Sequence, residues 1–286
     1  MAGLALGERA GHRPGGPALW RLAGLVGLGG CLLVWLVLLG PLGALLAHLR
    51  PSVVGRALSA PGALGPLVTS LEASALALAL LVVLGTPLAW AMARDRLPAP
   101  RIIEAGVLVP LLMPPLVIGL LLVFLAGPAT PVGRALGLVH LSASDTFFAL
   151  VLAELYEAGP YYVLGVAAAV RSVDPELEAQ AALLGDPWPR VARRVTLPLA
   201  APGVASTLAV AWARAIGAFG AVIIVAYHPY GLPMQIWVTL EEQGLPAALP
   251  FALVLLVVAL PLPLLGLLWA ARTQRAAQVE PLEVPG

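Results

Sequence analysis

Lysine is missing from this chain of 286 residues, so all 16 of its basic residues are arginine. A phosphate-binding P-loop needs a lysine directly after its glycines, so the chain has no ATP site of that kind. Charged residues are also scarce, at 11% of the chain, where a soluble domain has about 25%. Because 60% of the residues are hydrophobic, the chain cannot cover a water-facing surface. Its composition predicts an integral membrane protein.

Cysteine and histidine are too few, and too scattered, for a metal site. The single cysteine, Cys31, excludes a disulfide framework and a cysteine-based metal site. The four histidines are His12, His48, His140 and His228. They lie at or beyond the ends of the apolar runs, and no two have the spacing of metal ligands. No zinc-protease motif or nucleophile elbow occurs, and a net charge of +1 does not suggest nucleic acid. We therefore expect no catalytic residue, no metal ligand, no bound cofactor and no nucleic-acid partner.

Long apolar runs dominate what is present. A helix needs about 20 mostly apolar residues to cross a bilayer. Six stretches qualify, at residues 22–48, 67–92, 103–126, 146–169, 203–227 and 249–271. The first is too long for the core of a cleaved signal peptide, and all six should be helical because lipid offers backbone groups no partner. The predicted fold class is therefore an all-α integral membrane protein with six transmembrane helices. A transmembrane domain over residues 21–271 should lie between tails at 1–20 and 272–286.

The arginines predict the orientation of these spans, because cytoplasmic connections carry an excess of basic residues. With the N-terminus inside, twelve arginines fall on inside segments: Arg9, Arg13, Arg21, Arg94, Arg96, Arg101, Arg171, Arg190, Arg193, Arg194, Arg272 and Arg275. Three fall outside: Arg50, Arg56 and Arg134. We therefore expect a multi-pass protein of the cell (inner) membrane, with both termini and the connection at about 171–202 in the cytoplasm.

A polar segment inside this connection, residues 176–198, is here called the elbow. Residues 178–184 are strong helix formers, and Gly185 suits the position after a helix, where a positive φ is needed. Asp186 fits an N-cap and Pro187 the first position of a second helix. The pattern predicts a helix, a sharp corner and a short basic helix that ends at Pro198. Its apolar side chains are suited to a groove on a soluble partner: Leu183, Leu184 and Trp188.

Prolines and buried charges mark a second region, inside the spans. Pro110, Pro114, Pro115 and Gly119 lie within a few turns, which predicts a kink. The kink would either line a transport path or serve packing alone. Arg214 lies inside the fifth span, and its natural partner is Glu154 or Glu157, one turn apart on the fourth. Either Arg214 faces an aqueous path and attracts an anion, or it has a structural role, in an ion pair or by extending its charged end to the membrane interface.

The elbow resembles the EAA loop of ABC-importer permeases. That loop has an acidic, Ala-rich helix, a glycine, nine further residues and an aliphatic-x-Leu-Pro sequence. Here Gly185 is followed by nine residues and then by Val195-Thr196-Leu197-Pro198. The family usually has its Glu six residues before the glycine, where this chain has Ala179, and Glu178 lies one residue earlier.

Two further stretches resemble one branch of that family. The proline-rich residues 110–119 are similar to a span of the molybdate and sulfate permeases. Residues 213–222 resemble the fifth span of molybdate/tungstate permeases, although Gly217-Ala218 replaces the usual Ser-Glu.

The resemblance implies an ABC type I importer permease fold and an oxyanion substrate, molybdate or tungstate in the first place. Sulfate, thiamine and ferric iron are the alternatives within the family. ATP and Mg would be bound by a separate ATPase present in two copies, so the permease itself would not be an enzyme. A periplasmic or lipid-anchored binding protein would deliver the substrate to a homodimer of permeases in the lipid bilayer. A secondary transporter is the competing class, but it would need two inverted halves, and no such internal repeat is visible.

Two sets of site residues follow. The ATPase-coupling loop should comprise Glu178, Ala181, Gly185, Asp186, Trp188, Arg190, Leu197 and Pro198. The translocation path should comprise Pro114, Pro115, Gly119, Arg214, Gly217, Phe219 and Gly220.

Overall fold

The computed structural model describes residues 17–266 and 268–269, and over these residues its regular structure is entirely helical. The chain divides into two units, residues 1–49 and 50–286, which are described separately. The predicted tails lie largely outside the described residues. The exception is the end of the N-terminal tail, predicted to extend to residue 20, because helix α1 already begins at Pro17.

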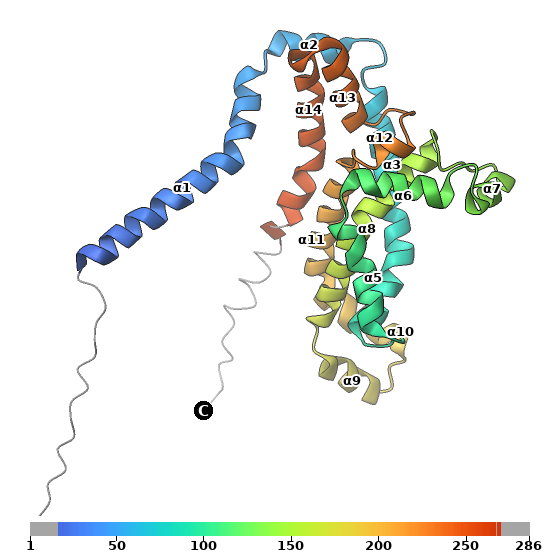
Figure 1. The fold of residues 1–286 in the computed structure, drawn as a ribbon. Coiled ribbons are helices and arrows are strands. Elements are labelled where there is room, and N and C mark those ends of the chain that lie inside the picture. Colours follow the sequence, from blue (N-terminus) through green and yellow to red (C-terminus); the bar gives the residue numbers. More distant parts are fainter. Residues whose placement is uncertain (1–16, 267, 270–286) are drawn as a thin grey trace, which may run out of the picture. The chain divides into compact units, whose positions relative to one another are not determined.

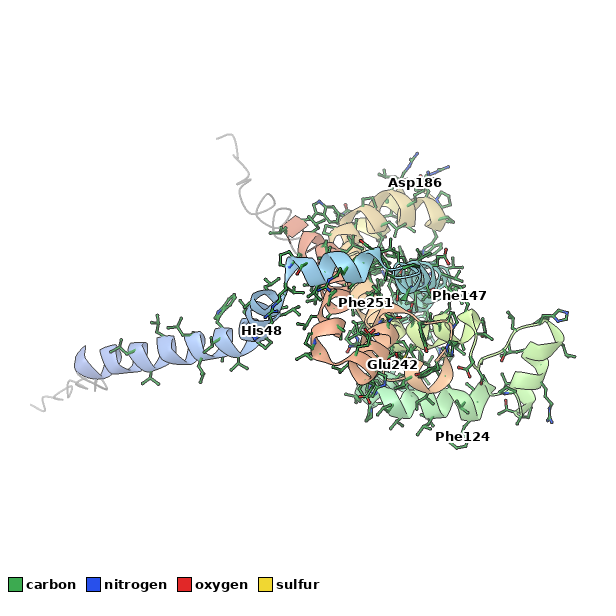
Figure 2. The ribbon with its side chains drawn as sticks, turned by 90° about the horizontal axis from the view of Figure 1, so that it is seen from above. His48, Phe124, Phe147, Asp186, Glu242 and Phe251 are labelled. Atoms are coloured by element: carbon green, nitrogen blue, oxygen red, sulfur yellow. The ribbon has the colours of Figure 1, made fainter. Side chains whose placement is uncertain are left out.

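The first unit consists of helix α1 (Pro17–His48). Its 32 residues give a length of about 48 Å at 1.5 Å per residue, which exceeds the hydrocarbon thickness of about 30 Å. Residues 24–48 qualify as a membrane span. Leucines, valines and Trp35 are exposed all round this helix, and Figure 2 shows its side chains pointing outward on every side. An apolar surface without a polar face is what a helix in contact with lipid requires.

The second unit holds the remaining described helices (Figure 1). They are α2 (Pro51–Ser59), α3 (Gly65–Leu80), α4 (Thr86–Ala93), α5 (Pro100–Leu112), α6 (Pro115–Ala126), α7 (Pro131–Leu138), α8 (Phe147–Arg171), α9 (Pro175–Leu183), α10 (Trp188–Val191), α11 (Leu197–Ile216), α12 (Val222–Val225), α13 (Leu232–Gln243) and α14 (Leu245–Ala259). Two π turns, η1 (Leu81–Gly85) and η2 (Ala192–Thr196), lie within longer helical segments.

Helix α8 is the centre of this unit and packs against α3, α4, α5 and α11. The α8–α11 contact is close because glycines remove side chains from it. A Cβ on Gly165 would lie 2.5 Å from Thr207, and one on Gly203 would lie 2.7 Å from Ala169. Small residues at helix crossings are how membrane helices approach each other, since lipid supplies no hydrophobic drive between them.

Five described helical segments are long and apolar enough to cross a membrane, at residues 24–48, 65–93, 147–171, 188–216 and 245–266. The predicted third span is different. It consists of α5 and α6, bent by 116° at a break between Leu112 and Pro115. The predicted kink at residues 110–119 is therefore present, but it interrupts the helix completely. Met113 and Pro114 both precede a proline, which forces them out of the helical region, and both are extended, with ψ of 140° and 135°.

The fifth span also differs from its prediction. Residues 188–216 form one helical segment. The second elbow helix therefore does not end at Pro198, as was predicted. The span ends at Ile216 and not at residue 227. The π turn η2 lies directly before Leu197 and Pro198. Its wider turn leaves space for the proline ring and uses one backbone donor fewer, so the helix continues through Pro198. The later boundary fails because the chain leaves the helix at Gly217.

Candidate functional site

The elbow corner is a helix end of the Schellman type. Helix α9 finishes at Leu183, and Gly185 has a φ of +91°. The N–H of Gly185 donates to Ala182 O (3.0 Å) and that of Asp186 donates to Ala181 O (3.3 Å), the two bonds of this motif. A Cβ on Gly185 would meet nothing within 4 Å, so glycine is favoured here by backbone conformation and not by space.

The start of the second elbow helix was predicted one residue too early. Helix α10 begins at Trp188 with Pro187 at its N-cap position, and no side chain caps it. Pro189 occupies the first turn, so the first-turn proline is Pro189 and not Pro187. Asp186 is not the N-cap. Its carboxylate accepts a hydrogen bond from Arg190 (2.9 Å) and lies 4.0 Å from Arg194, which ties the corner to the basic helix that follows.

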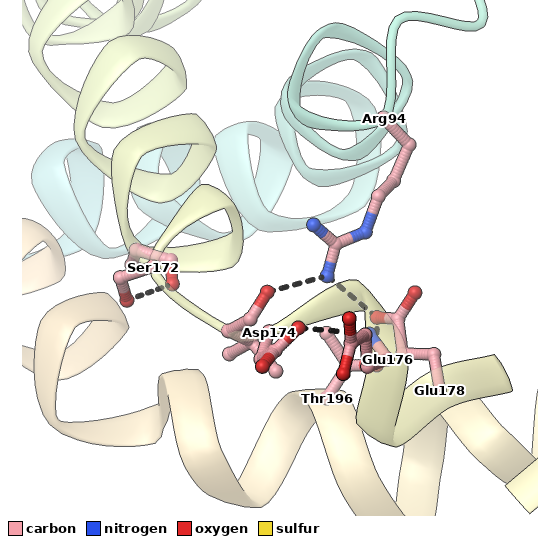
Figure 3. Close-up of polar contacts among 8 residues, drawn as sticks. Arg94, Ser172, Asp174, Glu176, Glu178 and Thr196 are labelled. Carbon is pink, nitrogen blue, oxygen red and sulfur yellow. Dashed lines mark hydrogen bonds and ion pairs between the residues drawn. The ribbon is translucent and has the colours of Figure 1, made fainter. Parts of the chain in front are cut away.

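The acidic residue that holds the elbow is Glu178 (Figure 3). Its Oε1 accepts hydrogen bonds from Arg94 Nη2 (2.6 Å) and from the hydroxyl of Thr196. Arg94 Nη2 also donates to Val173 O (3.4 Å). The side chains of Arg94 and Glu178 are only 11% and 19% exposed. One carboxylate therefore joins the end of α4, helix α9 and the π turn η2.

The sequence placed Glu178 in the loop, one residue before the position of the family Glu, but it did not indicate Arg94 and Thr196 as its partners. Arg94 is 84 residues away along the chain and had been counted only as one of the arginines that set the orientation. In the structure Glu178 itself joins the loop to Arg94 and Thr196, although Ala179 occupies the family position of the Glu.

Large apolar side chains are exposed on the elbow. Leu183 and Leu184 are 87% and 90% exposed. Trp188 is 51% exposed, because its other half packs on the body. Its ring lies edge-on to Trp90, with centroids 5.8 Å apart, and the guanidinium of Arg96 lies 5.5 Å from its centroid. These three exposed apolar side chains at the elbow corner, Leu183, Leu184 and Trp188, are here called the elbow patch.

The predicted path residues gather where two helix breaks meet. One break separates α5 from α6, and the other, residues 217–221, separates α11 from α12. A Cβ on Gly220 would lie 2.5 Å from Pro115 Cβ, and a Cβ on Gly119 would lie 2.8 Å from Ala221 O. Pro115, Gly119 and Gly220 are thus brought together, and only glycine permits so close an approach of the two backbones.

Arg214 forms the ion pair that was expected as one of two alternatives. Its Nη2 lies 3.4 Å from Glu157 Oε2, and its guanidinium lies 5.1 Å from the ring centroid of Tyr161. Glu157 is 3% exposed and Arg214 is 41% exposed. The other carboxylate, Glu154, is buried and accepts a hydrogen bond from Ser74 (2.9 Å). Arg214 is therefore held on one side by Glu157 and Tyr161 and remains accessible on the other.

Glu157 also connects Arg214 to the second break. Its Oε1 accepts a hydrogen bond from the backbone N–H of Ala221 (3.3 Å). Of the remaining predicted path residues, Pro114 is at the first break and Gly217 is exposed at the end of α11. Phe219 lies against Trp237, with ring centroids 5.6 Å apart. Among the described residues no cluster of three or more potential metal ligands occurs.

Residues 81–277 match the family described as "Binding-protein-dependent transport system inner membrane component". A probable molybdenum ABC transporter permease of Haloferax volcanii is 39% identical over 85% of this chain and 88% of its own length. A molybdenum transport system permease of Mycobacterium tuberculosis is 35% identical over 71% and 78%. A molybdate/tungstate transport system permease of Thermococcus kodakarensis is 33% identical over 65% and 71%.

The fold has solved counterparts as well. The crystal structure of a bacterial ABC transporter involved in the import of alginate contains a chain with a TM-score of 0.64 at 19% identity, over 88% of this chain and 96% of that one. At this identity the likeness concerns the fold alone, and it agrees with the fold expected from the sequence. The family match and the three relatives carry the assignment: the chain belongs to the inner-membrane permease components of binding-protein-dependent ABC transport systems.

Proposed function

We propose that this permease moves an oxyanion, molybdate or tungstate, across the cell membrane into the cytoplasm. The observation that carries the proposal is that relatives at 33–39% identity bear the names of molybdenum or molybdate/tungstate permeases. Sulfate is the second candidate, because a probable sulfate permease of Nephroselmis olivacea is 29% identical over 85% of this chain. The alginate transporter shows that the fold by itself does not select the substrate.

In this proposal the elbow is the docking site of a separate ATPase subunit, present in two copies and carrying ATP and Mg. The elbow patch supplies exposed apolar side chains, and Arg190, on the basic helix, is half exposed. Glu178 and Arg94 join the elbow to the rest of the second unit. Movement of the elbow patch would therefore be transmitted to that unit and would not be absorbed by a flexible loop. The excess of arginines on these segments supports a cytoplasmic location of the elbow and both termini in this proposal.

The meeting of the two helix breaks is the proposed path. Broken helices at membrane depth are tolerated where they are buried in protein or line a water-filled cavity. Arg214 supplies a partly exposed cation beside these breaks, which suits an anionic substrate. A homodimer related by a twofold axis would place two such regions around one path. A periplasmic or lipid-anchored binding protein would deliver the anion to it.

The substrate is tested on the cognate binding protein by calorimetry. We expect tight binding of molybdate and tungstate and weak binding of sulfate, followed by uptake of molybdate when that protein, this permease and the ATPase are reconstituted in vesicles. Tight sulfate binding without a molybdate response would contradict the proposed substrate and leave the family assignment intact.

The elbow patch predicts a loss of ATPase binding when one exposed leucine is replaced. Leu184→Asp should lower co-purification of the ATPase at least about tenfold, as removal of a central interface residue does. Leu138→Asp is the matched control, because Leu138 is 84% exposed but lies on α7. Equal co-purification of both variants would remove the docking role.

The Glu178 contact predicts a local loss of stability. Glu178→Gln removes the charge that compensates Arg94 and should cost about 1.5–3 kcal/mol, the value of a charge-assisted hydrogen bond. Hydrogen exchange across residues 175–196 should accelerate, and coupled uptake should fall. Glu104→Gln is the control, since the Glu104–Arg171 pair is 3.4 Å long and exposed, and such pairs contribute at most about 1 kcal/mol. Unchanged exchange in Glu178→Gln would show that the elbow is held by other contacts.

The position of Arg214 predicts that its replacement lowers oxyanion uptake without weakening assembly with the ATPase. Arg214→Gln should lower oxyanion uptake about tenfold or more, because a cation in a cleft raises the local anion concentration. Arg214→Lys should retain a larger part of the activity, and ATPase co-purification should be unchanged in both. Arg134→Gln, on α7, is the control. Normal uptake by Arg214→Gln would leave the Glu157 ion pair as a purely structural feature.

A further inference from the structure

A cavity of about 630 Å³ opens between helix α2 and the α13–α14 pair. In Figure 1 these helices lie at the end of the second unit opposite α9 and α10. The polar and charged residues that line it are Arg56, Gln235, Thr239 and Gln243. The remaining lining residues are Val53, Ala57, Ala60, Pro61, Gly62, Ala63, Pro246, Ala247 and Phe251. The cavity thus combines one cation, one polar wall and one apolar wall.

The cavity lies where two membrane spans begin. Pro246 and Ala247 are among the first residues of the span at 245–266, and residues 60–63 directly precede the span at 65–93. The ends of spans mark the boundary between the hydrocarbon core and the polar headgroups. A ligand in this cavity would therefore lie at the level of the lipid headgroups.

Arg56 is free to bind an anion at this level. Its Nε donates to Ser52 O (3.2 Å), and in the part of the chain that the structure describes no carboxylate lies within ion-pair distance of it. Guanidinium groups recognise phosphate oxygens through paired N–H donors. The free terminal nitrogens of Arg56 can therefore hold a phosphate.

The polar wall is a stripe on one face of α13, with residues four apart. Gln235 Nε2 donates to Thr239 Oγ1 (2.8 Å), and Thr239 is buried. The carbonyl oxygen of Gln235 and the exposed amide of Gln243 are left for a polar ligand. Val53 on α2 and Phe251 on α14 also line the cavity and offer apolar contacts. This combination suits a ligand that has a polar head and a hydrocarbon portion.

We propose that the cavity binds the headgroup of an acidic phospholipid, with its phosphate at Arg56 and its first acyl carbons against Phe251. The volume lies within the range of about 300–1,000 Å³ that is usual for ligand sites. Basic pockets between membrane helices are known to hold acidic headgroups. A free tetrahedral oxyanion offers the same charge but would leave the apolar wall unused. The site is separate from the proposed path, and it does not depend on the identity of the transported anion.

Native mass spectrometry of the purified permease tests the proposal. Titration with phosphatidylglycerol should give tighter binding than titration with phosphatidylcholine of the same acyl chains. Arg56→Gln should weaken phosphatidylglycerol binding about fivefold, the attraction of one arginine to an anionic lipid surface, and should abolish the preference over phosphatidylcholine. Arg50→Gln is the matched control, because Arg50 is the N-cap residue of the helix that carries Arg56 in its last turn but does not line the cavity.

A second variant separates the cavity from its charge. Ala57→Phe should fill the space and lower phosphatidylglycerol binding while Arg56 is retained, whereas Arg56→Lys should preserve most of it. Equal binding of both lipids by the unmodified protein would overturn the proposal. So would displacement of bound phosphatidylglycerol by millimolar inorganic phosphate or molybdate, which would assign the cavity to a free oxyanion. Weaker capture of the binding protein by Arg56→Gln, with unchanged lipid binding, would assign it to protein docking.

Discussion

Hydrocarbon offers no hydrogen-bond partner to a peptide group, so a helix broken inside the membrane must find its partners within the protein. The second unit has one such break within a candidate span, between α5 and α6, and a second interruption at residues 217–221, directly after the span that ends at Ile216. These two stretches of irregular backbone lie against each other. Glycines at 119 and 220 let the backbones touch, and Glu157 accepts the N–H of Ala221. Irregular backbone at membrane depth is tolerated where it is buried in protein or lines a water-filled cavity. The contact between these two stretches meets the first condition.

Charged residues are few in this chain, and two of its carboxylates each have more than one partner. Glu157 receives both Arg214 and a backbone N–H, and Glu178 receives both Arg94 and Thr196. Removing one partner from such a carboxylate leaves the other in a poorly solvated site, where an uncompensated charge is costly. Breaking an exposed pair such as Arg171–Glu104 costs little stability, because water solvates the charge that remains. Each shared carboxylate thus joins three elements of the chain with very few polar atoms.

Local rules and hydropathy predicted a large part of this structure. Apolar length located five spans, and the positive-φ preference of glycine located the corner at Gly185, since both depend on neighbouring residues alone. The prediction failed where distant or competing contacts decide. Nothing near Glu178 in the sequence points to Arg94, and hydropathy cannot distinguish a straight span from two helices bent by 116°. Pro198 was read as a helix end because the rule for α-helices takes no account of a π turn that accommodates the ring.

That π turn changes how a push on the elbow would travel. Because the helix continues through Pro198, one helical segment runs from Trp188 to Ile216, about 43 Å at 1.5 Å per residue. Helix α9 is joined to it at the π turn itself, where Thr196 donates to Glu178. In the proposed mechanism, a force applied at the elbow patch would enter this helix at Trp188 and again at Thr196. It would reach Arg214 through one continuous helical segment. A helix that ended at Pro198 would instead have placed a break between the proposed docking surface and the proposed path.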